Sequence, residues 1–142
     1  MTFKEWSKKY YPIEASKLVH SNWKTAIYHS IRKWKGIAAI YKLNIDQKEH
    51  NIIFENQDKF SVDSSTCALC QKGEAKFTCF SCPIFKITKS DCSLEYSAFI
   101  EDQNPYPMLK LLKKVYRKWN KRYHTHIKRK RKETSNIMNS IL

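Results

Sequence analysis

Five cysteines between residues 67 and 92 constrain this chain more than any other feature of its sequence. Four of them form two C-x-x-C pairs, Cys67 with Cys70 and Cys79 with Cys82, and the fifth is Cys92. A C-x-x-C pair folds into a tight turn that brings two sulfurs to one metal ion, so two pairs supply the four ligands of a tetrahedral site. We therefore predict a metal site made by Cys67, Cys70, Cys79 and Cys82. Cys92 is expected either to replace one of the four, Cys79 or Cys82 before the others, or to pack beside the site.

The ligand type predicts Zn2+, because a closed four-sulfur site favours zinc. An iron–sulfur cluster uses the same ligands, and reduced thiols without a metal are the third alternative. Disulfides are not expected, because the cysteine count is odd and the first residues lack the apolar core and cleavage site of a secretory signal. These features predict a cytoplasmic protein. We expect the ion to stabilise the segment from 67 to 92, which has one glycine and few large apolar side chains.

Catalysis is not expected at this site. A catalytic zinc ion needs an open coordination position, and four sulfurs leave none. The sequence also lacks the H-x-E and P-C-x-x-C elements of zinc deaminases, the H-E-x-x-H motif of metalloproteases and the glycine-rich nucleotide-binding loops. We therefore expect a binding protein that has no small-molecule substrate.

Composition and periodicity predict a mainly α fold. Only two glycines and four prolines occur in 142 residues, which favours helices over glycine-rich turns. Apolar residues recur every three or four positions from 13 to 44, which predicts one or two helices. Residues 44 to 66 are expected to be a connector in which 51 to 54 could form a strand. The predicted fold has helices on both sides of a small zinc-knuckle module, with a short β-hairpin as an optional part.

The helix predicted between 13 and 44 has an apolar face that includes Trp23 and Trp34. An amphipathic core helix explains this pattern, and the alternative is that the two indoles stack on nucleic-acid bases. Lys33 is assigned to the opposite, basic face together with its lysine and arginine neighbours. Gly36 is expected to mark a weak point or a bend.

A strongly basic helix is predicted near the C-terminus. The breaker Asp102–Pro107 precedes it, and from Met108 to Lys132 the chain has 12 lysines and arginines and no acidic residue. We predict an N-terminal helical region at 1–66, a zinc module at 67–100, this helix at 106–132 and a tail at 133–142, all in one compact domain. The predicted partner-binding residues are Lys110, Lys113, Lys114, Arg117, Lys118, Lys121, Arg122, Lys128, Arg129, Lys130 and Arg131.

The net charge points to an anionic partner. Lys and Arg total 27 against 13 Asp and Glu, a formal charge of +14, which is typical of proteins that bind nucleic acid or a complex containing it. No membrane association is expected, because no apolar run approaches the length of a membrane span.

The order Trp34, C-x-x-C, C-x-x-C-P, Cys92 and Tyr96 resembles a group of small cysteine-rich proteins from phages and mobile elements of Gram-positive bacteria. The match covers about residues 30 to 100. Members usually have Thr-Pro-Tyr after the last cysteine, whereas this chain has Leu94-Glu95-Tyr96 and retains only the tyrosine.

In size, zinc module and composition rich in lysine, isoleucine and asparagine, the chain also resembles zinc-containing anti-CRISPR proteins. Such proteins bind a CRISPR effector nuclease and block its loading of nucleic acid. The resemblance implies an inhibitor that binds this nuclease, or its nucleic acid, in the bacterial host cell. The alternative is a zinc-containing DNA- or RNA-binding regulator that uses the basic C-terminal helix.

Overall fold

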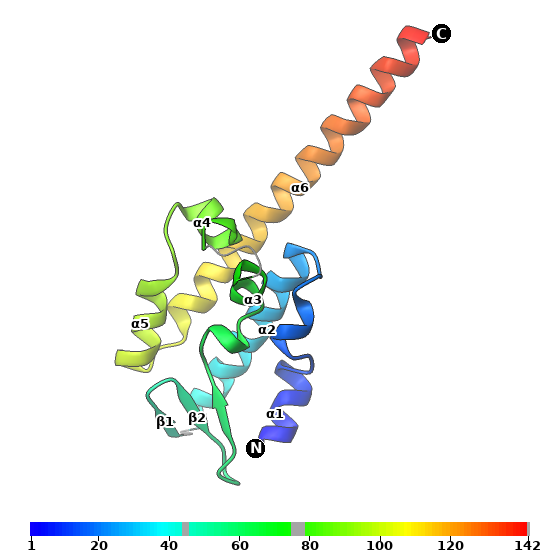
Figure 1. Ribbon diagram of the computed structural model, residues 1–142. Coiled ribbons are helices and arrows are strands. Elements are labelled where there is room, and N and C mark those ends of the chain that lie inside the picture. Colours follow the sequence, from blue (N-terminus) through cyan, green and yellow to red (C-terminus); the bar gives the residue numbers. More distant parts are fainter. Residues whose placement is uncertain (44–45, 75–78, 142) are drawn as a thin grey trace.

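The computed structural model describes the backbone of residues 1–43, 46–74 and 79–141, and side chains except those of 123–128 and 139–141 within its last helix and of residue 74. In these residues the fold is mainly α, as predicted, and a small antiparallel sheet accompanies the helices (Figure 1). The helices and strands in chain order are α1 (Phe3–Tyr10), η1 (Ala15–Leu18), α2 (Trp23–Tyr41), β1 (Asp46–Lys48), β2 (Asn51–Ile53), β3 (Lys59–Ser61), η2 (Ser64–Thr66), α3 (Ala68–Glu74), η3 (Cys79–Ser81), α4 (Pro83–Thr88), α5 (Ser93–Asp102) and α6 (Tyr106–Ile141), where η denotes a short 3-10 helix.

Helix α2 is the centre of the fold and packs against α1, α3 and α6. The Asn22 side chain caps its N-terminus by accepting a hydrogen bond from the Thr25 amide at 2.8 Å, which satisfies a donor that has no partner within the helix. The Trp34 side chain is 3% exposed and meets the Phe99 ring edge to face at 5.1 Å. Trp34 is therefore a core residue, and the interpretation as a stacking platform for bases is wrong for this side chain.

Lys33 also lies inside the protein, with 1% of its surface exposed, so its assignment to the basic face of the helix was wrong. The reason lies in the spacing. Ser30 and Ile37 are both buried, and Lys33 is three residues from one and four from the other, which places all three on one side of the helix.

Helix α1 lies in the region 1–66 that was predicted to be helical, but it was not predicted as a separate helix, because only Trp6 is buried in its eight residues. A capping box forms it locally: Thr2 accepts a hydrogen bond from the Glu5 amide, and the Glu5 side chain accepts one from the Thr2 amide. The Trp6 indole is fully buried and donates to the Gly36 carbonyl at 3.0 Å, which joins α1 to α2.

Gly36 allows α1 and α2 to approach closely. A Cβ atom at this position would lie 2.5 Å from Cβ and Cγ of Tyr10 and 2.9 Å from Nε1 of Trp6. Gly36→Ala is therefore expected to lower the free energy of unfolding by about 2 kcal/mol, because overpacking outweighs the helix propensity of alanine. Urea unfolding measures the effect. Lys35→Ala, on the exposed face of the same helix, should change stability by less than about 0.5 kcal/mol; a Gly36→Ala variant as stable as the parent would contradict the close approach.

The predicted connector from 44 to 66 contains the three-stranded sheet, in the order β1-β2-β3. Gln47 pairs with Ile52, which pairs with Phe60, and Ile52 and Phe60 are buried. Each strand has three residues, too few for sequence periodicity to identify it. The sheet precedes the cysteine segment in the chain, and the described residues of that segment contain short helices and no strand.

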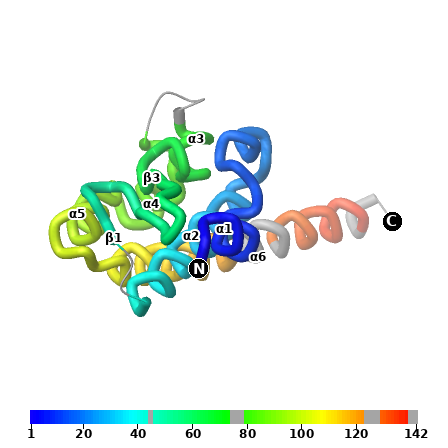
Figure 2. The backbone as a smooth tube through the Cα atoms, turned by 90° about the horizontal axis from the view of Figure 1, so that it is seen from below, coloured from blue at the N-terminus to red at the C-terminus, as the bar shows by residue number. Residues whose placement is uncertain are grey.

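Helix α6 has an inner part that packs and an outer part that does not. Met108, Leu112 and Val115 are buried, and the helix contacts α2, α4 and α5. Its outer part extends away from the rest of the protein (Figures 1 and 2), and every side chain from 129 to 138 is exposed. The helix continues to Ile141, so the predicted boundary at 132 was too early; residues 133–141 contain no glycine or proline that would end it. None of the described helices is long and apolar enough to cross a membrane.

Candidate metal centre and basic helix

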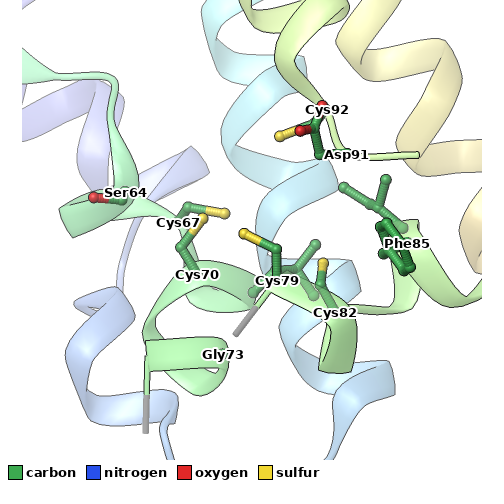
Figure 3. Close-up of a pocket in the computed structure, with 11 residues that line it drawn as sticks. Ser64, Cys67, Cys70, Gly73, Cys79, Cys82, Phe85, Asp91 and Cys92 are labelled. Atoms are coloured by element: carbon green, nitrogen blue, oxygen red, sulfur yellow. The ribbon is translucent and has the colours of Figure 1, made fainter. Parts of the chain in front are cut away.

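All five cysteines line one cavity of about 600 Å3 (Figure 3). Four short elements bring them there: Cys67 and Cys70 come from the start of α3, Cys79 from η3, Cys82 from the residue before α4, and Cys92 from the residue before α5. In the close-up, the sulfurs of Cys79 and Cys92 point toward the Cys67–Cys70 pair. The structure thus brings together the four predicted ligands and the alternative ligand Cys92.

Hydrogen bonds converge on one sulfur of the first pair, that of Cys67. The Cys70 thiol donates a hydrogen bond to the Cys67 sulfur, and the amides of Cys70 and Leu69 donate to it as well. The hydrogen bond from Cys70 and the positive charge of Lys33 hold the pKa of Cys67 well below its usual range. The same hydrogen bond, together with burial, raises the pKa of Cys70. Within the pair, the hydrogen bond thus favours negative charge on Cys67 over Cys70.

The two cysteines of the second pair, Cys79 and Cys82, differ in their exposure to solvent. Cys82 immediately precedes α4, whose first residue is Pro83, and the amides of Ile84 and Phe85 donate to the Cys82 sulfur. Burial nevertheless raises the pKa of Cys82 to about 11. Cys79 is the one exposed cysteine of the five. It directly follows residues 75–78, which lie outside the described part of the chain.

Cys92 is as well placed as Cys79. It is half-buried, immediately precedes α5 and lines the same cavity. Burial, together with the nearby sulfurs of Cys67 and Cys82, raises its pKa to about 12. Cys92 therefore belongs to the same electrostatic group as Cys67 and Cys82, whereas sequence spacing alone made it the surplus thiol.

The donor set fits a thiophilic metal ion such as Zn2+, since four or five sulfurs converge on one space. Among the described side chains, no three cysteine, histidine, aspartate or glutamate residues already form a closed set of metal ligands. Zinc–sulfur bonds of about 2.3 Å would therefore require the cavity to contract around the ion. Binding would also release protons from thiols such as Cys82 and Cys92, whose pKa values burial raises.

A smaller cavity of about 350 Å3 adjoins the cysteines and contains two residues that matter to the site. Lys33 lines it together with Cys67, Cys70 and Cys92, although sequence reasoning had placed it in solvent. Tyr96 lines it too and donates its hydroxyl proton to the Val62 carbonyl at 2.6 Å. Tyr96 thus supports the wall of this cavity, a role that the sequence resemblance did not specify.

The predicted partner-binding residues lie along α6. Those whose side chains the structure describes are all exposed: Lys110, Lys113, Lys114, Arg117, Lys118, Lys121, Arg122, Arg129, Lys130 and Arg131. Lys128 lies in the stretch 123–128, outside the described side chains. At a rise of 1.5 Å per residue, the charges from Lys110 to Arg131 extend over about 32 Å of helix. The first acidic residue of α6 is Glu133.

Comparisons with models of protein families, with curated proteins and with solved structures find no match for this chain, so the resemblance to phage and anti-CRISPR proteins stays a prediction.

Proposed function

We propose that this chain is a zinc-stabilised, non-enzymatic binding protein. In this proposal it binds nucleic acid through α6, in the cytoplasm of a bacterial cell. One observation carries the proposal: a helix of 36 residues extends beyond the core, and those of its lysine and arginine side chains that the structure describes are exposed along it. The cysteine centre supplies stability rather than chemistry, because it holds the segment from 67 to 92 against the helices that support α6.

For the metal site we propose a tetrahedral zinc ion with Cys67, Cys70 and Cys82 as three ligands and either Cys79 or Cys92 as the fourth. Cys67 and Cys82 already accept hydrogen bonds from backbone amides, an arrangement that stabilises thiolates. Cys70 is hydrogen-bonded to Cys67, and Cys92 is the more buried candidate for the remaining position.

The dimensions of α6 suit a nucleic-acid groove. A helix with its side chains is about 10–12 Å across, and the major groove of B-DNA is about 12 Å wide. Lys113, Arg117 and Lys121 follow one another at four-residue intervals and so lie on one face, where they could contact successive phosphates. The outer basic run from Arg129 would extend these contacts along the backbone.

The test is the salt dependence of binding. We expect the zinc-loaded protein to bind duplex DNA or RNA at about 50 mM salt and to lose about 10³-fold in affinity or more by about 200 mM, because six or more phosphate contacts release that many counterions. Fluorescence anisotropy with labelled double-stranded and single-stranded oligonucleotides of DNA and RNA measures this loss. Absence of binding to all four probes at about 50 mM salt would contradict the proposal.

Inhibition of a CRISPR effector nuclease is a second candidate, and exposed apolar residues favour a protein partner. Ile137 is 60% and Met138 58% exposed near the outer end of α6, beside the basic run. Such residues add apolar contact area to a protein interface but contribute little to phosphate binding. A complex with the nuclease that survives about 0.5 M salt and blocks its cleavage of DNA would support this role, because phosphate-driven binding is weak at that concentration.

A further inference from the structure

The buried lysine of α2 is the least expected charge in the protein. Lys33 is 1% exposed, and its ammonium donates a hydrogen bond to the Thr66 carbonyl at 3.1 Å. Thr66 directly precedes Cys67, so Lys33 is tied to the chain at the point where the cysteine segment begins. The ammonium also lies 5.6 Å from the centre of the Trp34 ring.

No carboxylate within the described residues forms an ion pair with this ammonium. Burial lowers the pKa of Lys33, and four groups oppose this by favouring its positive charge: in decreasing order, Cys67, Cys70, Asp63 and Cys92. Three of these four are cysteines of the cavity that Lys33 lines. A buried cation without a counter-ion is strongly unfavourable, so a fully buried lysine indicates that negative charge accumulates beside it.

We propose that Lys33 is the positioning residue and electrostatic partner of the metal–thiolate centre. The inference rests on the proposed zinc function. Zn2+ with four thiolates carries a net charge of −2, and the ammonium of Lys33 offsets half of it in an environment from which water is largely excluded. The hydrogen bond to Thr66 also fixes the backbone that leads into Cys67. Lys33 thus stabilises the zinc-bound state more than the metal-free state.

Three variants separate the charge of Lys33 from its hydrogen bond. Lys33→Met keeps an unbranched side chain, one atom shorter, and removes both the charge and the donor, whereas Lys33→Gln retains a donor without the charge. Lys35→Met is the matched control, since Lys35 is exposed on the same helix. For each purified full-length protein, zinc affinity is measured at constant pH by competition with a chromophoric chelator. Melting temperature is measured with and without zinc.

We expect both Lys33 variants to bind zinc about 10- to 100-fold more weakly than the parent, and Lys35→Met to bind it equally well. Without metal, Lys33→Met should melt at the same temperature as the parent or higher, because an unpaired buried charge has been removed. The stabilisation by zinc should shrink in both Lys33 variants. This opposite response of the two states is what a merely structural lysine would not produce.

If the parent protein binds zinc, three results would contradict the role proposed for Lys33 without contradicting the zinc site. The first is unchanged zinc affinity in Lys33→Met, and the second is parental affinity in Lys33→Gln, which would assign the effect to the hydrogen bond. The third is an equal loss of melting temperature in the metal-free and zinc-bound forms. A parent protein that binds no zinc would instead overturn the proposed function, and this inference with it.

Discussion

Removal of zinc by a strong chelator is expected to lower the melting temperature of the protein on the order of 10 °C. If free zinc is about 1,000 times its dissociation constant, binding stabilises the folded state by about 4 kcal/mol. In a chain of this size, 1 kcal/mol corresponds to about 2–4 °C. The loss should reach beyond the cysteines, because Leu69 of α3 and Ile84 of α4 belong to the main hydrophobic core, and α3 and α4 pack against α2 and α6.

Differential scanning fluorimetry before and after chelation, with zinc readdition as the control, measures this effect. Elemental analysis should give one zinc ion per chain. A protein that contains neither zinc nor iron, or whose melting temperature does not respond to chelation, would contradict the metal site. Two or more iron atoms per chain would instead indicate an iron–sulfur cluster in the same cavity.

Serine variants identify the ligands within the same experiment. Cys67→Ser, Cys70→Ser and Cys82→Ser should each abolish stoichiometric zinc and lower the melting temperature as far as chelation does, because three thiolates and a hydroxyl hold zinc poorly. Of Cys79→Ser and Cys92→Ser, only one should have this effect, and the other should retain one zinc ion per chain. Full zinc occupancy in Cys70→Ser would show that the proposed ligand set is wrong.

The sequence was most informative where chemistry fixes spacing. Two C-x-x-C pairs identified the cysteines that the fold brings to one cavity, and the apolar spacing identified the central helix. Cys92 could not be placed by the same logic, because nine residues separate it from Cys82 and it returns to the cavity only through the packing of α4 and α5 against α6. The position of Lys33 was predicted wrongly for a different reason. Its spacing from Ser30 and Ile37 agrees with the buried face of α2, but its charge favoured an exposed position.

Short helices and strands were the other elements that the sequence analysis did not predict. Each strand of the sheet has three residues, and α1 has a single buried side chain, so neither produces a periodic pattern. Their positions depend on contacts between distant parts of the chain, such as the hydrogen bond from Trp6 to Gly36 and the packing of Trp6 against Phe60 at 4.8 Å. Local sequence does not encode such contacts in a form that spacing rules can detect.

Neutralising part of α6 is expected to have the largest effect on binding. A variant with four exposed basic residues of this helix replaced by glutamine should bind nucleic acid at least about 100-fold more weakly at about 50 mM salt, because each lost phosphate contact removes about one released counterion. The slope of log affinity against log salt should fall by up to about 4 for the same reason. The four residues are Lys113, Lys114, Arg117 and Arg129.

A matched control removes the same charge elsewhere. Replacing four exposed lysines of α1 and α2 by glutamine also changes the formal net charge from +14 to +10, since four positive charges are lost. The residues are Lys4, Lys8, Lys24 and Lys35. If α6 is the binding surface, this control should keep the salt slope of the parent, because only the long-range field has changed. Equal losses in both variants would mean that net charge alone attracts the nucleic acid and that α6 has no special part in binding it.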